Sequence, residues 1–243
     1  MAIADARTLW RMVRGQPAAA SLRDRLEGFY APQASRYDAF REGFLHGRRA
    51  LVARLPIGPG MRVVELGGGT GRNLDFLGDR LSELARYELV ELAPSMAAEA
   101  RRRAASRVNV RVIEADAVRY TPSEPVDCVL FSYSLTMMPD WFRAVDNAVS
   151  MLEPGGVLGV VDFHVSGAHP APGRVRHGAA TRIFWPLWFA HDGVHLSPDH
   201  LPYLQSRLET LICEERHGRV PYLPGLRVPW YLFVGRKAPP AEL

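Results

Sequence analysis

One stretch, residues 63–71, constrains the fold of this chain more than any other. It reads Val-Val-Glu-Leu-Gly-Gly-Gly-Thr-Gly, so two β-branched residues and an acid run into a cluster of glycines. Leucines then recur at helical spacing from Leu74 to Leu84. The sequence therefore predicts a strand over 61–66, a tight turn and a helix over 71–84. Glycines in such a turn adopt positive φ and let a ligand approach the free N–H groups of the turn and of the helix start.

The spacing of the glycines restricts the ligand. Gly67, Gly69 and Gly71 form the pattern G-x-G-x-G, and Arg72 follows. The dinucleotide fingerprint G-x-G-x-x-G needs Gly or Ala where Arg72 stands. NAD therefore fits poorly, and a dehydrogenase is the least favoured enzyme class.

The rest of the chain continues the alternation of strand and helix. Further strands are predicted over 87–92, 108–113, 126–131 and 157–163, and helices over 95–105, 140–152 and 198–208. This alternation is typical of an α/β fold with a mostly parallel sheet that helices cover on both faces. The last two strands, about 210–217 and 228–235, are expected to form an antiparallel hairpin at the edge.

The pattern of predicted helices and strands divides the chain into two parts. We expect residues 1–60 to form an N-terminal helical segment or lid, in which Pro32 interrupts a helical pattern over 21–54. Residues 61–243 are expected to form one domain, with a substrate-side insertion at about 164–196 that holds the aromatic run 184–189. An insertion there lies beyond the carboxyl end of a strand, where open α/β sheets bind ligands.

Composition limits the location and the partners of the protein. The 243 residues contain no apolar run of 18 and no signal peptide pattern, so a cytoplasmic location is expected. The net charge is +4, with ten Arg against five acids in residues 1–60. This excess fits a solvated face or peripheral contact with an anionic membrane on its inner face, where residues 1–20 would form a basic amphipathic helix.

Other partner classes find no support in the sequence. No motif for nucleic-acid binding accompanies the basic residues. The two cysteines, Cys128 and Cys213, have neither disulfide nor metal spacing, so no metal is expected. No obligate protein partner is inferred.

Three acids close to predicted strand ends suggest the ligand. Glu91 lies 20 residues after Gly71, where a carboxylate accepts hydrogen bonds from ribose hydroxyls. Asp116 can accept from an adenine amino group, and Glu65 suits a cationic group. Each acid alone is more often a cap or a solvated residue. Together they favour a ligand with a ribose, an amine and a positive charge, as in S-adenosylmethionine, over a pyrophosphate.

Four motifs between residues 61 and 163 extend this argument. They are Glu65-Leu-Gly-Gly-Gly-Thr-Gly71, Val90-Glu-Leu-Ala-Pro-Ser-Met96, Ala115-Asp-Ala117 and Leu152-Glu-Pro-Gly-Gly-Val157. Together they resemble the class I S-adenosylmethionine-dependent methyltransferases. The resemblance implies a Rossmann-like sheet of seven strands in the order 3-2-1-4-5-7-6, with strand 7 antiparallel. Gly68 departs from the family, which often has Asp or Cys there.

The resemblance also implies residue roles. The glycine turn would contact the methionine moiety, Glu91 the ribose, and Asp116 with Ala117 the adenine. The full set of cofactor-binding residues expected is Tyr37, Glu65, Gly67, Gly69, Gly71, Asn73, Glu91, Leu92, Met96, Asp116, Ala117 and Ser132.

The flanking segments show a narrower resemblance. Tyr30-Ala-Pro-Gln-Ala-Ser-Arg-Tyr-Asp38, Phe44-Leu-His-Gly-Arg48 and Phe184-Trp-Pro-Leu-Trp-Phe189 are similar to segments of bacterial betaine-lipid N-methyltransferases. Those enzymes trimethylate the amine of diacylglyceryl-homoserine. The resemblance implies an amine-bearing lipid substrate at a membrane surface.

An N-methyltransferase needs a way to remove a proton and a wall that tolerates a growing cation. His164 is the first candidate for the base, although a capped or core histidine is an equally good interpretation, and Tyr37 is the second catalytic candidate. Aromatic faces stabilise quaternary ammonium groups. The substrate-binding residues expected are Tyr133, His164, Trp188 and Tyr203, with Tyr37 completing an aromatic cage. Arg176, Arg182 or Arg227 would hold a substrate carboxylate.

Two rival functions remain open from the sequence. The first is a soluble O- or N-methyltransferase that acts on a small molecule. The second belongs to another class, a non-catalytic module that binds the cofactor on the same fold.

Overall fold

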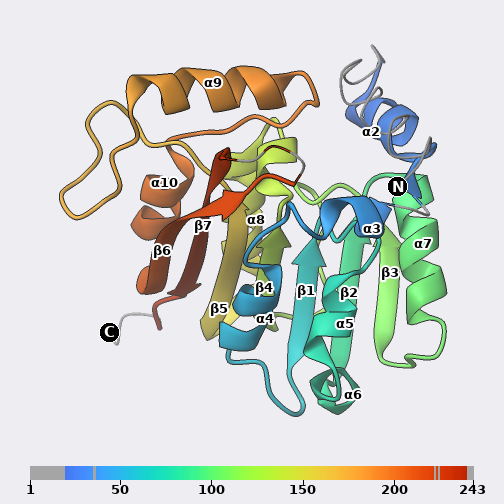
Figure 1. The fold of residues 1–243 in the computed structure, drawn as a ribbon. Helices are drawn as coiled ribbons and strands as arrows, with labels where there is room; N and C mark the ends of the chain where they lie inside the picture. Colours follow the sequence, from blue (N-terminus) through green and yellow to red (C-terminus); the bar gives the residue numbers. More distant parts are fainter. Residues whose placement is uncertain (1–19, 35–36, 222, 224, 240–243) are drawn as a thin grey trace.

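The structure, a computed structural model, describes residues 20–34, 37–221, 223 and 225–239. A seven-stranded sheet forms its centre, in the order β3-β2-β1-β4-β5-β7-β6 (Figure 1). The strands from β1 to β5 pair in parallel, whereas β7 runs antiparallel to both β5 and β6. This topology confirms the Rossmann-like α/β fold and the strand order expected from the sequence.

The strands are β1 Arg62–Leu66, β2 Arg86–Glu91, β3 Val110–Glu114, β4 Val126–Ser132, β5 Leu152–Phe163, β6 Glu209–Arg219 and β7 Arg227–Arg236. The helices are α2 Leu22–Tyr30, α3 Tyr37–Arg41, α4 Arg48–Arg54, α5 Asn73–Leu77, α6 Arg80–Glu83, α7 Pro94–Ala104, the 3-10 helix η2 Leu135–Met137, α8 Trp141–Met151, α9 Ala179–Ala190 and α10 His200–Arg207.

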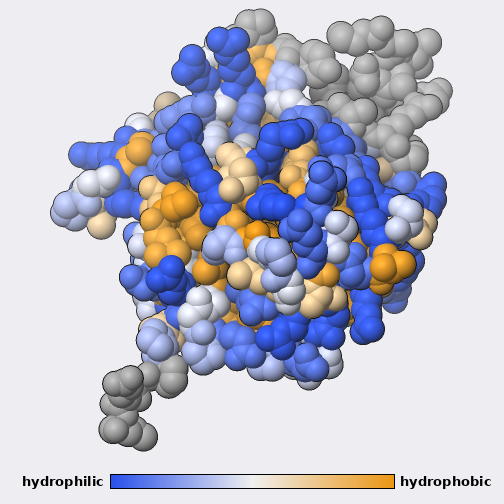
Figure 2. Space-filling model, turned by 90° about the horizontal axis from the view of Figure 1, so that it is seen from below, coloured by the Kyte–Doolittle hydropathy of each residue, from blue (hydrophilic) through white to orange (hydrophobic). Residues whose placement is uncertain are grey.

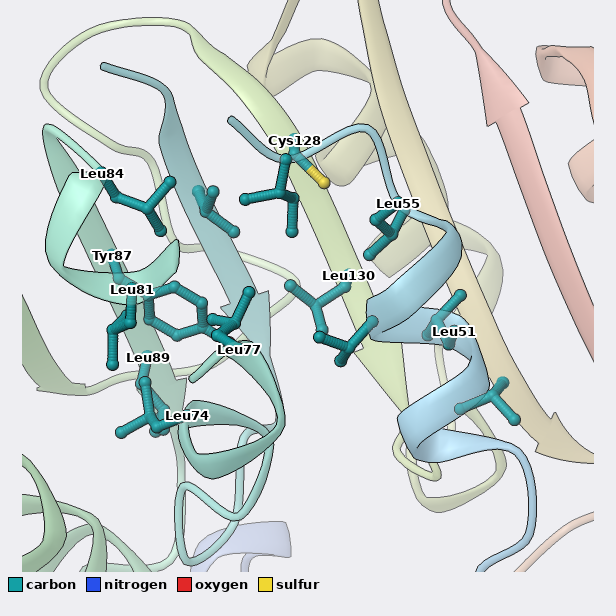
Figure 3. Packing of buried hydrophobic residues seen from close by; sticks show 14 of the residues in the cluster. Leu51, Leu55, Leu74, Leu77, Leu81, Leu84, Tyr87, Leu89, Cys128 and Leu130 are labelled. Carbon is teal, nitrogen blue, oxygen red and sulfur yellow. The ribbon is translucent and has the colours of Figure 1, made fainter. Parts of the chain in front are cut away.

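The sheet is buried on both faces because successive side chains of a strand point to opposite sides. On β1, Val63 belongs to the core on one face, and Val64 and Leu66 to the core on the other. Figure 3 shows the first core, where leucines from α4 and α5 pack over β1, β2 and β4. Helices α8 and α10 supply the second core.

Three predicted elements differ from the structure. The helix predicted over 71–84 is two short helices, because Gly78 adopts φ +58° between α5 and α6. Helix α10 starts at His200 rather than at the predicted residue 198, and Ser197 accepts a hydrogen bond from the Asp199 N–H at 3.1 Å just before it. The last two strands do form a hairpin, but only β6 lies at the edge, since β7 pairs with β5 as well.

The region around the insertion also differs. Strand β5 begins directly after α8, so the Pro-Gly-Gly sequence at 154–156 belongs to the strand, and its pairing with β4 is irregular between Val126 and Cys128. Within 164–196 the structure contains a regular helix, α9. The proposed amphipathic helix over 1–20 lies almost entirely outside the described residues. None of the helices in the described part of the chain has the length and apolar character needed to cross a membrane.

Candidate active site

A cavity opens at the carboxyl edge of the central strands and holds about 850 Å³ of space, including its open mouth. It lies where β1, β2 and β4 end, which is the usual ligand position in open α/β sheets. Helix α2 and residues near α3 and α4 complete its wall. Of the expected cofactor residues, those that line it are Tyr37, Glu65, Gly67, Gly69, Asn73, Glu91, Leu92, Met96, Asp116, Ala117 and Ser132.

The glycine turn brings backbone to the cavity wall. Gly67, Gly69 and Gly71 have φ values of +72°, +56° and +75°, in the region that favours glycine. A Cβ on Gly67 would lie 2.5 Å from the Cβ of Ser134, whereas a Cβ on Gly69 would meet only the Met96 methyl group, at 3.5 Å. Gly71 does not line the cavity and instead packs next to Leu74. Its role is therefore in the turn itself.

Glu91 is fixed at the end of β2. Its Oε2 accepts a hydrogen bond from the Gly69 N–H at 2.8 Å, and its Oε1 accepts one from the Ala93 N–H at 2.8 Å. The side chain is only 7% exposed but lines the cavity. Burial raises the pKa of the carboxyl above its ordinary value, against the opposing effect of the backbone hydrogen bonds. Two backbone hydrogen bonds thus hold this acceptor in the cavity wall.

Glu65 is the second buried acid of the cavity. It is 1% exposed, and it accepts hydrogen bonds from the Asn73 amide and the Tyr87 hydroxyl, each at 2.6 Å. Burial raises the pKa of Glu65 to about 7, and the hydrogen bonds and the charge of Arg48 oppose this effect. A cationic ligand group in the cavity would stabilise the ionised form.

The third acid, Asp116, lies after β3. Its Oδ1 accepts a hydrogen bond from the Val118 N–H at 2.9 Å, which holds the loop around Ala117 in place. Both residues line the cavity, as does Leu92 after β2. Acids from the ends of three neighbouring strands, β1, β2 and β3, thus surround one space, as the sequence predicts.

A polar strap joins the N-terminal helices to the glycine turn. Asp38 accepts a hydrogen bond from the Thr70 hydroxyl at 2.7 Å, and it pairs with Arg103 of α7 at 2.5 Å. Next to Asp38, the Tyr37 ring stands edge-on to Tyr30 at 5.5 Å between centroids. Both rings line the cavity. The strap therefore positions aromatic side chains over the ligand space.

Tyr133 directly follows β4 and lines the cavity. It has φ +57°, the only positive φ among the non-glycine residues that the structure describes. Its hydroxyl donates to the His46 carbonyl at 2.6 Å, and its ring packs against Phe163 at 4.6 Å. Backbone strain of this kind costs about 1–3 kcal/mol and is often found at functional sites. Its persistence here fits a role for the ring in the cavity wall.

Three expected substrate residues lie outside the cavity. His164 is buried on the far side of β5, where its Nε2 pairs with Glu215 Oε1 at 2.9 Å. Trp188 lies on the surface of α9, and the Tyr203 hydroxyl donates to Asp146 at 2.7 Å on the α8–α10 side. His164 alternates with Phe163 along the strand, so it points away from Tyr133. The structure therefore does not place His164 as a base for a reaction in the cavity.

The three candidate arginines for a substrate carboxylate, Arg176, Arg182 and Arg227, do not line the cavity either. Arg48, at the start of α4, does. Its side chain is buried, one nitrogen donates to Glu42 at 3.1 Å, and its Nε has no hydrogen-bond partner within the described residues. Sequence reasoning missed this role because nothing in the pattern around Gly47 indicates that Arg48 turns inward.

No group of three or more side chains that could hold a metal ion comes together within the described part of the chain. The lining combines three acids, two arginines and apolar side chains from Leu22, Leu26, Leu45 and three methionines. This composition suits an organic ligand with cationic and polar parts.

The central part of the chain is similar in sequence to known methyltransferases. Residues 63–156 match the family model of a methyltransferase domain. Trans-aconitate 2-methyltransferase from Escherichia coli strain 55989 is 33% identical over 110 residues, which are 45% of this chain and 42% of the relative. The corresponding protein of Shigella flexneri matches to the same extent. The chain thus spans less than half the length of the curated relatives it matches.

Solved structures agree on the fold. The N-methyltransferase NodS from Bradyrhizobium japonicum WM9, in complex with S-adenosylhomocysteine, superposes with a TM-score of 0.64 at 17% identity, covering 89% of this chain and 98% of NodS. A Haemonchus contortus N-methyltransferase, solved with phosphomonomethylethanolamine and S-adenosylhomocysteine, gives 0.68 at 14% identity, covering 91% and 61%. These structures share the fold of this chain, and residues 63–156 within that fold match the model of a methyltransferase domain.

Proposed function

We propose that this protein is an S-adenosylmethionine-dependent methyltransferase. The observation that carries the proposal is the pairing of Glu91 with the Gly69 N–H at the wall of the cavity. A carboxylate held in this way presents free lone pairs to two adjacent hydroxyl groups, as in a ribose. The matched methyltransferase domain, which contains both residues, supports the same conclusion.

The residues of the cavity fit the parts of this cofactor. Glu91 would hold the ribose, and Asp116 with Ala117 would border the adenine. The backbone at Gly69 leaves space for the methionine moiety, and Glu65 would lie near its positive charge. A pyrophosphate in the same place would meet two buried acids, which disfavours a dinucleotide.

When bound, S-adenosylmethionine supplies an electrophilic methyl group on a sulfonium. In the transfer, the acceptor forms a bond to the methyl carbon while the carbon–sulfur bond breaks and its electron pair stays on sulfur. The protein contributes mainly alignment of the two reactants, which can lower the barrier by up to about 7–11 kcal/mol. Neither a histidine nor a cysteine belongs to the described lining of the cavity. An amine acceptor would therefore release its proton to a carboxylate or to water.

For the acceptor, we favour the amine of a homoserine-type betaine-lipid precursor at a membrane surface. Tyr30, Tyr37 and Tyr133 line the cavity and offer aromatic faces to a growing ammonium, each worth roughly 0.5–2 kcal/mol. Leu22 and Leu26 of α2 add an apolar wall at the same opening. Trp188 and Tyr203 play no part in this cage, because they lie elsewhere.

A soluble small acid is the second candidate substrate. The relatives from Escherichia coli and Shigella flexneri are named for trans-aconitate, and Arg48 offers a buried guanidinium to an anionic group. A carboxylate acceptor also needs no base, since it carries no proton at neutral pH. The same cavity would then run O-methylation.

A labelling experiment separates these two candidate substrates. The protein is incubated with methyl-labelled S-adenosylmethionine and either a total bacterial lipid extract or a pool of soluble acids. Label on a quaternary amine in the organic phase supports the lipid substrate. Label confined to base-labile esters in water contradicts it and leaves methyl transfer standing. Binding of the cofactor without transfer to either pool would favour the non-catalytic module. Glu91→Ala provides the control for transfer that does not depend on the cavity.

A further inference from the structure

Helix α9 carries an apolar face that the rest of the described chain leaves uncovered. Ile183 is 61% exposed, Phe184 40%, Leu187 70% and Trp188 47%. Their spacing at i, i+1, i+4 and i+5 puts all four on one side of the helix. Contiguous apolar surface on this scale in a soluble domain marks a site of contact with a protein or a membrane.

The opposite side of α9 is anchored in the core. Trp185 and Phe189 are buried, and the Phe189 ring stacks on Phe163 at 4.5 Å. Phe163 packs in turn against Tyr133, which lines the cavity. The exposed face is thus the outer side of a rigid aromatic layer whose inner side reaches the proposed acceptor end of the cavity.

Helix α9 and the cavity lie at the same end of the molecule. In Figure 1, α9 and α2 stand at the top, above the edge where the parallel strands end. The opposite end, seen in Figure 2, is mainly hydrophilic with smaller hydrophobic areas. A surface that receives α9 would therefore also face the mouth of the cavity.

The charge around α9 is one-sided. The segment 164–198 contains three arginines, and Asp192 is its single acid. Arg174 is ion-paired with Glu215 of β6 at 3.4 Å, which leaves Arg176 and Arg182 as the basic side chains close to the exposed face. The Asp192 side chain is buried, so it does not offset the positive surface, and Arg176 is exposed just before the helix. Exposed Trp, Phe, Leu and Ile beside Arg, without exposed acid, are the composition of helices that lie in the interface of an anionic bilayer.

We infer that α9 is a membrane-docking helix whose exposed face inserts into the interfacial region of an anionic phospholipid bilayer. Docking in this orientation turns the cavity mouth toward the lipid headgroups. A second copy of the chain is the weaker occupant, because two such faces would bring the basic segments of both copies together. The inference concerns vesicle binding by the protein without cofactor, so it stands or falls independently of methyl transfer.

Co-sedimentation with vesicles tests this docking. The full chain is mixed with vesicles of phosphatidylglycerol and phosphatidylcholine, and with vesicles of phosphatidylcholine alone. We expect binding to the anionic vesicles and a roughly tenfold or greater loss of binding in Leu187→Asp. Val108→Asp is the matched control, because Val108 is fully exposed in the loop after α7, away from the α9 face. It should bind like the wild type.

Fluorescence gives a second readout that does not depend on a charged substitution. Vesicles with brominated acyl chains should quench tryptophan emission in the wild type and much less in Trp188→Phe. The inference is overturned if the wild type does not bind anionic vesicles, if Leu187→Asp binds as well as Val108→Asp, or if quenching is unchanged in Trp188→Phe. A wild-type dimer that Leu187→Asp converts to monomer would also overturn it and assign the face to a second copy.

Discussion

The carboxylate of Glu91 and the backbone N–H of Gly69 lie 2.8 Å apart, joining the end of β2 to the turn that follows β1. The two residues are 22 positions apart in sequence. Their hydrogen bond fixes the acid and the open backbone in one wall of the cavity. The proposed cofactor site depends on this relationship.

Replacing Glu91 tests its role as the ribose acceptor. Glu91→Ala should weaken the binding of S-adenosylmethionine by about 2 kcal/mol or more, because truncation leaves ligand hydroxyl groups without acceptors. Titration calorimetry measures the change. Glu114→Ala is the control. Glu114 lies on β3, directly opposite Glu91 of β2 in the sheet register, but it does not line the cavity. If the two variants bind S-adenosylmethionine with equal affinity, Glu91 does not contribute to the binding site.

Substitution of two glycines with similar positive φ distinguishes an effect on stability from an effect on cofactor binding. Gly69 has φ +56° and lines the cavity, and Gly60 has φ +75°, with nothing within 4 Å of an added Cβ. Gly69→Ala and Gly60→Ala should each cost about 1 kcal/mol of stability. Only Gly69→Ala should reduce cofactor affinity, by roughly tenfold, because its methyl group enters the ligand space. Loss of affinity in both variants would mean that strain alone explains it.

The buried acid Glu65 predicts a pH dependence of stability. Burial raises its pKa in the folded state to about 7 from 4.5, so the folded protein binds more protons than the unfolded chain between these values. The free energy of unfolding should therefore fall as pH rises from 4.5 to 7, by about 3 kcal/mol from this group. Glu65→Gln removes the contribution.

Chemical denaturation of wild type and Glu65→Gln over this pH range provides the measurement. Other groups with shifted pKa values, among them Asp162, Asp192, His177 and His200, are present in both proteins, so their contributions largely cancel in the difference. The difference in unfolding free energy should change steadily with pH and level off above about pH 7. A constant difference would contradict a buried, titrating Glu65.

Two substitutions of Tyr133 test the roles of its ring and of its hydroxyl separately. Tyr133→Phe keeps the ring but loses the hydrogen bond to the His46 carbonyl, so stability should drop by about 1 kcal/mol with activity largely retained. Tyr133→Leu also removes the aromatic face, which should lower kcat/KM for an amine acceptor by roughly 2- to 30-fold. Cofactor affinity should be unchanged in both. Equal kinetics of the two variants would exclude cation–π stabilisation by Tyr133.

Local sequence signals explain why the sheet and the position of the three acids could be predicted. The glycine turn after β1 and the acids near neighbouring strand ends follow from short patterns, since parallel strands bring their carboxyl ends to one edge. Glu65, Glu91 and Asp116 accordingly line one cavity, as predicted.

The acceptor end was harder to predict for physical reasons. A shift of one residue along β5 reverses the side that a side chain faces, so Phe163 borders the Tyr133 side and His164 does not. Helix α9 contains Pro186, and proline is disfavoured in a helix interior, so the local sequence is a poor signal for this helix. Arg48 reaches the cavity because tertiary packing places α4 beside α5, the helix after the glycine turn, and no local pattern encodes that contact.

Titration of the purified protein with S-adenosylhomocysteine, alongside NAD under the same conditions, tests the central claim most directly. The account predicts saturable binding of S-adenosylhomocysteine with one site per chain, lost or strongly weakened in Glu91→Ala, and no binding of NAD. Absence of binding to S-adenosylhomocysteine, or tighter binding of NAD, would contradict it.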